Sequence, residues 1–172
     1  GCHFPERAWT TPQPVDPKVG GALNKRNAPS MLNLAYHSSW YWDGRAATLE
    51  AVSNAAWKGQ LGADPAAVVA TLNAKSELKA RFKRAYSEPA TVDNVPKALA
   101  SFLRALASAD APFDKFQAGD KAAISADAQK GFEVFKKAGC LGCHLPPLFS
   151  DFNFHNAGIG SDKPEAERDH GR

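Results

Sequence analysis

Apolar side chains recur with the period of an α-helix through the middle of the chain. The clearest set falls at positions i, i+4, i+7, i+8 and i+11 and comprises Val95, Leu99, Phe102, Leu103 and Leu106. Cap residues and apolar spacing also predict helices over 48–58, 66–74, 76–86 and 125–138. No segment alternates between polar and apolar residues as a half-buried strand does. The pattern therefore predicts a mostly α fold.

Both ends of the chain lack this periodicity. Residues 1–30 and 145–172 are rich in proline and glycine, which is typical of long irregular loops. Apolar residues such as Phe4, Trp9 and Val15 punctuate the first of these loops. A loop of this composition is expected to pack around something rather than to serve as a flexible linker.

Composition and charge exclude two classes of partner. The chain has 172 residues, which fits one average domain or two small ones, and a formal net charge of +3. Lysine and arginine are scattered rather than clustered, so no basic stripe indicates a nucleic-acid partner. No apolar stretch approaches the length that spans a bilayer, so no membrane span is expected.

Two of the three cysteines lie in one short motif, Cys140-Leu141-Gly142-Cys143-His144. In a C-x-x-C-H motif the two thiols bond to the vinyl groups of a haem, and the histidine binds the iron. The alternatives are a redox-active cysteine pair, which would need a βαβ context, and half of a zinc site. His155 is a candidate zinc ligand, but nothing in the sequence completes that set. The motif therefore predicts a covalently attached c-type haem.

The third cysteine, Cys2, is followed directly by His3. The pair has the form of the last two residues of a second C-x-x-C-H motif, whose first cysteine would precede residue 1. A chance Cys-His pair is the alternative, and spacing alone leaves both open.

The sequence resembles the bacterial di-haem cytochrome c peroxidase family, which includes the methylamine-utilisation enzymes that oxidise tryptophan side chains in partner proteins. The resemblance extends over essentially the whole chain. The segments that carry it are Arg26–Asn33, Trp42–Ala46, Asp93–Phe102, Phe113–Asp120, Cys140–His144 and Asp151–Gly158.

The resemblance implies two cytochrome c-like haem domains. Residues 1–120 would form the first, peroxidatic haem domain, lacking its N-terminal part. Residues 121–172 would begin a second, electron-transfer haem domain that lacks its C-terminal part. The first haem would be held by Cys2 and His3, and the second by Cys140, Cys143 and His144. A missing segment or another subunit would then cover the second haem.

Three further residues take roles from the family. Trp42 matches the tryptophan that mediates electron transfer between the haems, although a core aromatic residue is the alternative. Arg45 is expected to pair with a haem propionate, because a guanidinium matches a carboxylate bidentately. Asn27 matches a ligand of an inter-haem calcium ion, and an asparagine that caps a turn is the alternative.

The chain departs from the family at the expected distal pocket of the first haem. Many members have Glu-Met-Gly where this chain has Gln60-Leu61-Gly62. Glutamine donates and accepts hydrogen bonds but does not relay a proton as a carboxylate does, unless Glu50, Asp64 or water replaces it. No histidine lies between His3 and His37, so no loop histidine is expected to block the first haem. The single methionine, Met31, is expected to pack in the core rather than to bind iron.

These residues lead to one main functional hypothesis. The protein is expected to be a periplasmic oxidoreductase that reduces hydrogen peroxide with electrons from a small donor protein, a cytochrome c or a cupredoxin. One alternative is a sister enzyme that oxidises a side chain of a partner protein. Another is a non-enzymatic electron-transfer subunit of a larger complex. The replacement of the family glutamate by Gln60 keeps both alternatives open.

Overall fold

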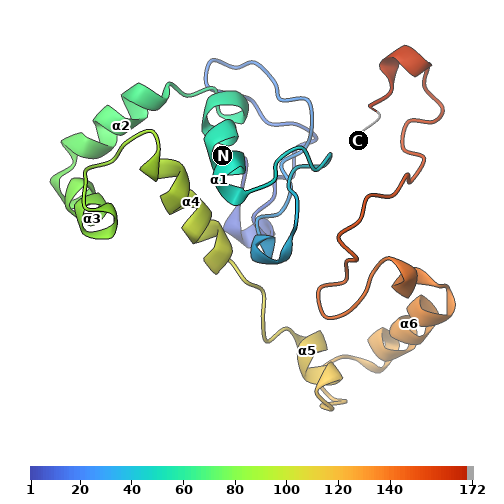
Figure 1. Ribbon diagram of the computed structural model, residues 1–172. Helices are drawn as coiled ribbons and strands as arrows, with labels where there is room; N and C mark the ends of the chain where they lie inside the picture. The colour runs from blue at the N-terminus through green and yellow to red at the C-terminus, as the bar shows by residue number, and fades with distance from the viewer. Residues whose placement is uncertain (170–172) are drawn as a thin grey trace. The chain divides into compact units, whose positions relative to one another are not determined.

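The computed structural model describes residues 1–169 and divides into two compact units, Gly1–Leu106 and Ala107–Arg172 (Figure 1). The sequence predicted a division near residue 120. The units divide earlier because Phe113 packs edge-on against Phe132 and Phe149, with ring centroids 5.0 and 5.1 Å away. The segment around Phe113 therefore folds with the second unit.

The predicted mostly α architecture is confirmed in the described residues, where strand pairing is limited to isolated bridges. The first unit contains α1 (Leu49–Ala55), α2 (Pro65–Ala74), α3 (Ser76–Tyr86) and α4 (Asn94–Ala105). Two of these helices have a side-chain N-cap. The Thr48 oxygen accepts from the Ala51 N–H at the start of α1, and the Asp64 carboxylate accepts from the Ala66 N–H at the start of α2, both at 3.0 Å. The predicted helix over 48–58 continues past α1 as a π-helical turn, Ala56–Gln60.

The core of the first unit lies where α1 packs on α4. Leu49, Ala100 and Leu103 are buried there, and Met31 packs against them as the sequence predicted. A second buried cluster, Trp57, Ala90 and Val95, lies beside α2 and α3. These two small clusters hold the helices α1 to α4 together.

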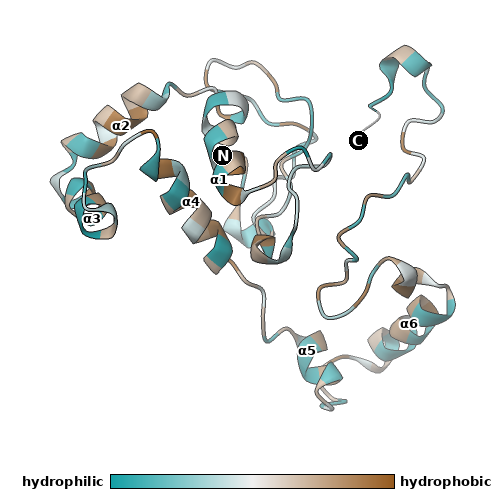
Figure 2. Cartoon of the chain, viewed as in Figure 1, coloured by the Kyte–Doolittle hydropathy of each residue, from teal (hydrophilic) through white to brown (hydrophobic). Residues whose placement is uncertain are grey.

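The second unit contains α5 (Pro112–Gln117), α6 (Ala126–Lys137) and long irregular segments. Ser125 caps α6 as predicted, with its hydroxyl accepting from the Ala128 N–H at 3.1 Å. Apolar and polar bands alternate along α6 (Figure 2). Yet none of the described residues of this unit is buried; its phenylalanine rings are only half-covered.

Within residues 1–169 no helix combines the length and the apolar character that crossing a membrane requires.

Candidate haem sites

The C-x-x-C-H motif follows directly from the end of α6. Gly139 takes the left-handed conformation at φ +79, which glycine adopts without steric cost, and so terminates the helix. The next residues form a tight 3-10 turn, Cys140–Gly142, and the His144 N–H donates to the Cys140 carbonyl at 2.9 Å. The turn therefore gathers Cys140, Cys143 and His144 in one short loop, and all three cysteine thiols of the chain are unpaired.

The imidazole of His144 is held by the backbone. Its Nδ1 lies 3.1 Å from the carbonyl oxygen of Phe149, five residues later. Because a carbonyl only accepts, Nδ1 carries the proton and Nε2 presents its lone pair. Metal-bound histidines are usually oriented by a hydrogen bond of this kind. His144 is therefore arranged as an iron ligand.

His3 shows the same arrangement at the start of the chain. Its Nδ1 lies 2.7 Å from the carbonyl oxygen of Trp9, six residues later. The Trp9 N–H in turn donates to the Phe4 carbonyl at 2.9 Å, and Phe4 and Thr10 form an isolated antiparallel bridge. The short loop after His3 thus fixes the imidazole as the loop after His144 does, which supports a second haem motif at Cys2 and His3.

Apolar side chains surround both loops. Beside the first, Trp9 packs edge-on against Phe102 of α4, with ring centroids 5.8 Å apart. Phe102 and Leu99 are nevertheless 48% and 41% exposed. Beside the second loop, the Phe135 ring lies 6.0 Å from the His144 ring, and Leu145 is exposed. Exposed apolar surface next to each histidine is what a porphyrin would cover, so the residues present fit a haem at both places.

A second set of metal-binding groups involves Cys143. Ligand atoms of Cys143, Asp151 and His155 lie within 4.8 Å of one another. His155 Nε2 is 2.8 Å from Asp151 Oδ2. Hydrogen bonds from the Asn153 N–H and from His155 lower the pKa of Asp151 to about 2. The structure thus adds Asp151 to His155 as a candidate ligand of the alternative zinc site. That site would also need the Cys143 thiolate, which a thioether bond to a haem would remove.

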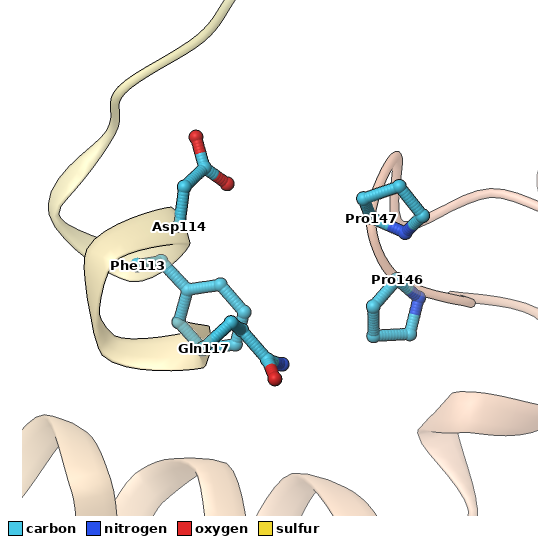
Figure 3. Close-up of a pocket in the computed structure, with 5 residues that line it drawn as sticks. All are labelled: Phe113, Asp114, Gln117, Pro146 and Pro147. Atoms are coloured by element: carbon cyan, nitrogen blue, oxygen red, sulfur yellow. The ribbon is translucent and has the colours of Figure 1, made fainter. Parts of the chain in front are cut away.

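A hollow of about 410 Å³ lies in the second unit beside the chain that follows His144. Figure 3 shows Phe113, Asp114 and Gln117 of α5 on one side and Pro146 and Pro147 on the other. The Asp114 carboxylate accepts from the Ala111 N–H at 2.9 Å and so serves the start of α5. Phe113 and the two prolines make the lining of this hollow mainly apolar, and its one carboxylate, Asp114, is used in capping α5.

Trp42 lies at the surface of the first unit. Its side chain is 56% exposed, so the alternative of a core aromatic residue is wrong. The indole is nevertheless held in place, because Nε1 donates to the Asn27 carbonyl at 2.9 Å. The Asn27 side chain donates to the Gln13 carbonyl at 2.7 Å and thereby braces the same loop, while its proposed calcium role stays a prediction.

Arg45 makes contacts that the sequence did not predict. Its guanidinium donates to both oxygens of Asp43, at 2.7 and 2.9 Å, and lies 3.6 Å from the centre of the Tyr41 ring. Arg26 donates to the same Asp43 carboxylate at 2.7 Å. These two guanidiniums lower the pKa of Asp43 against the opposing effect of its desolvation. Whether Arg45 also binds a propionate stays a prediction.

Gln60 is hydrogen-bonded inside the first unit. The Tyr41 hydroxyl lies 3.1 Å from Gln60 Oε1 and 3.3 Å from the Val52 carbonyl. Burial raises the pKa of the Tyr41 hydroxyl, which therefore stays protonated and able to donate. This contact could not be predicted from the sequence, because Tyr41 stands in an aromatic run that does not reveal which ring has a hydrogen-bond partner.

The two carboxylates that could have replaced the family glutamate are engaged elsewhere. Glu50 forms a bidentate pair with Arg104, at 2.6 and 3.0 Å, and this pair lowers the pKa of Glu50. Asp64 caps α2. His37 is half-buried, and burial lowers its pKa. Gln60 therefore remains the candidate distal residue.

Comparison with known proteins gives a consistent set of relatives. A family model described as di-haem cytochrome c peroxidase matches residues 1–122. The chain is 37% identical over 166 residues to the methylamine utilization protein MauG of Methylophilus methylotrophus, covering 93% of this chain and 50% of that protein. It is 30% identical over 172 residues to the cytochrome c peroxidase Ccp of Escherichia coli K12, covering 94% of this chain and 35% of that protein.

A solved structure shows the same fold. A MauG-like protein associated with microbial copper homeostasis superposes with a TM-score of 0.76 at 28% identity, covering 90% of this chain and 49% of that one. The chain thus spans about half the length of the relatives that it matches, or less.

The two histidine loops predict two covalent haems. In the full-length protein, denaturing mass spectrometry should find the mass of two haems. A Cys2→Ser variant should lose or weaken the attachment of one, and a Cys140→Ser, Cys143→Ser variant should lose the other. A single haem in the unaltered protein, with the Cys2 thiol reactive toward an alkylating reagent, would contradict the assignment of Cys2 and His3.

Proposed function

The chain belongs to the di-haem cytochrome c peroxidase family, and on that premise we propose that it is part of an enzyme that reduces hydrogen peroxide with electrons from a small periplasmic donor protein. The observation that carries the proposal is the matched pair of histidines. Nδ1 of both His3 and His144 is hydrogen-bonded to a backbone carbonyl, so Nε2 of each would be the atom that binds an iron. The reaction consumes two electrons and two protons for each peroxide and yields two waters.

The haem ligands divide between the two units. Cys2 and His3 would hold the first haem, and Cys140, Cys143 and His144 the second. A c-type haem supplies an iron that binds peroxide or exchanges electrons, depending on its surroundings. The protein supplies the orientation of each histidine, the apolar surface and the polar groups nearby. Covalent attachment of haem also supports a periplasmic location, with a cytochrome c or cupredoxin as the donor.

Gln60 is proposed as the polar group of the peroxide site. With Oε1 engaged by Tyr41, its amide nitrogen is left to donate a hydrogen bond to an oxygen ligand. An amide does not take up or release a proton at neutral pH, so this residue orients peroxide without relaying protons. Slow peroxide cleavage is the consequence.

Trp42 is proposed as the residue that conducts electrons between the haems. An indole is oxidisable, and this one is fixed at the surface by its hydrogen bond to Asn27 rather than used in the core. Asn27 is also proposed as a calcium ligand, and Arg45 as a partner of a haem propionate.

A second candidate function is oxidation of a side chain in a partner protein. Two observations favour it: Gln60 replaces the proton-relaying glutamate, and a 37% identical relative is the methylamine utilization protein MauG. An electron-transfer subunit without peroxide chemistry is the remaining alternative. In each case we propose that a further chain segment or another subunit covers the second haem and the partly exposed phenylalanine cluster of the second unit. This cluster comprises Phe113, Phe116, Phe132, Phe135 and Phe149.

Peroxide turnover tests the proposed function. The full-length, haem-loaded protein should oxidise two equivalents of reduced cytochrome c for each equivalent of hydrogen peroxide, measured by absorbance. A His3→Gly variant should lose this activity. Two loaded haems without peroxide consumption would contradict the proposal and favour the electron carrier. Consumption that requires a partner protein in place of the donor would favour the sister enzyme.

Replacing Trp42 should slow electron transfer between the haems. In Trp42→Phe, the ring remains but its oxidation becomes harder and the bond to Asn27 is lost. Both haem spectra should stay unchanged, while re-equilibration after rapid mixing with a reductant becomes slower. Trp40→Phe is the matched control, since its Nε1 likewise donates to a backbone carbonyl, that of Leu34, while its ring packs against the core around Leu49. A native rate in Trp42→Phe would exclude the conducting role.

Introducing the family carboxylate should accelerate the reaction with peroxide. Gln60→Glu keeps the acceptor for Tyr41 and adds a group that relays protons, so the rate should rise, by ~10²–10⁴-fold if the new carboxylate is well positioned. Stopped-flow absorbance of the haem bands measures this rate, and Gln117→Glu in the second unit is the control. An unchanged or lower rate would show that the distal group is a different residue.

A further inference from the structure

Asp16 is a buried carboxylate that the proposed function does not use. It lies in the irregular N-terminal loop, and the residue is only 4% exposed. One oxygen, Oδ1, accepts from the Thr11 hydroxyl at 2.9 Å. The other, Oδ2, is buried and has no hydrogen-bond partner among residues 1–169. A buried charge with an unmatched oxygen is costly, so this one needs an explanation.

The structural role of Asp16 does not need a carboxylate. Its backbone carbonyl accepts from the Asn24 N–H at 2.9 Å and from the Asn24 side chain at 3.0 Å, which ties the loop together. Every residue type supplies that carbonyl. The neutral donor Thr11 would be satisfied equally well by an asparagine at position 16. None of these hydrogen bonds therefore requires the negative charge of Asp16.

Asp16 lies beside the residues that hold the first haem. Phe4 and Thr10 form an antiparallel bridge, so their neighbours His3 and Thr11 flank the same pairing, and Thr11 binds Asp16. The charge also reaches Cys2: burial and, secondly, the negative charge of Asp16 raise the pKa of the Cys2 thiol. The charge of Asp16 is thus felt at Cys2, and Thr11, which binds Asp16, is the residue across the bridge from His3.

We propose that Asp16 sets the redox poise of the first haem, its buried carboxylate stabilising the oxidised iron and lowering the reduction potential. Reduction adds one electron to the iron and so brings a negative charge toward another. Burial strengthens this repulsion, because little solvent screens it. Burial and charge around a haem are established means of tuning its potential. The proposal rests on the proposed function only in that Cys2 and His3 carry a haem.

Substitution of Asp16 in the haem-loaded, full-length protein tests this role. Asp16→Asn removes the charge and keeps an acceptor for Thr11. Optical redox titration without peroxide should then show a more positive midpoint for one haem, with its reduced-to-oxidised ratio at a fixed potential raised by about tenfold. That haem should be the one lost in Cys2→Ser. The midpoint of the other haem should not move.

Two control variants separate the effect of a buried negative charge on the midpoint from the effect of net charge. Asp16→Glu retains the charge and should keep the midpoint close to native. Glu6→Gln removes an exposed carboxylate three residues after His3 and should move the midpoint much less, because solvent screens it. Equal shifts in Glu6→Gln and Asp16→Asn would overturn the proposal, since net charge alone would then explain both.

A second neutral variant keeps the test valid if Asp16→Asn does not fold or load haem. Asp16→Leu removes the charge and the polar oxygens together, and Thr11→Val in the same variant removes the buried hydroxyl that would otherwise lose its acceptor. Whichever of the two neutral variants loads both haems should show the positive shift, and a native midpoint there rejects the proposal. If neither neutral variant loads haem while Asp16→Glu does, the charge is needed for assembly, and tuning is likewise rejected. Because the titration needs no peroxide, its result stands whether or not the protein proves to be a peroxidase.

Discussion

The hydrogen bond from Nδ1 of a histidine to a carbonyl a few residues later is the contact on which both candidate sites depend. It fixes the tautomer, so that Nε2 of His3 and of His144 keeps the lone pair that a metal ion would need. The loops that supply the carbonyls both begin with an apolar residue and a proline after the histidine, Phe4-Pro5 and Leu145-Pro146, and differ in sequence from there to Trp9 and Phe149. The surrounding structure holds those loops in place: the bridge between Phe4 and Thr10 in one case, and the packing of Phe149 on Phe113 in the other.

Two haem sites would explain why the described chain buries so few of its own apolar side chains. The first unit buries only small apolar clusters around Leu49 and Trp57, and the described part of the second unit buries no residue. Apolar rings such as Phe102 and Phe135 instead face the histidine loops from α4 and α6. A haem at each place would supply the missing apolar partner, and binding free energy would then become folding free energy.

Much of the fold could be predicted from the sequence, because periodicity and caps are local signals. The helices α2, α4 and α6 begin and end within a residue or two of their predicted bounds. The sequence missed α5, a short helix whose rings fold with the second unit, and the π-helical turn that carries Gln60. The candidate haem histidines were predicted from the motif and from family resemblance, and the structure adds the Nδ1 contact of each. The partners of Tyr41, Asp43 and Asp16 could not be predicted, because they lie on segments that meet only in the folded chain.

The short sequence separation of the histidine contacts bears on the order in which the protein is assembled. His3 reaches Trp9 across six residues and His144 reaches Phe149 across five, so each contact lies within one short loop. A loop of about ten residues closes in roughly 10–100 ns, far faster than a domain folds. Each histidine can therefore adopt this tautomer early, before the aromatic packing that later holds its loop has formed.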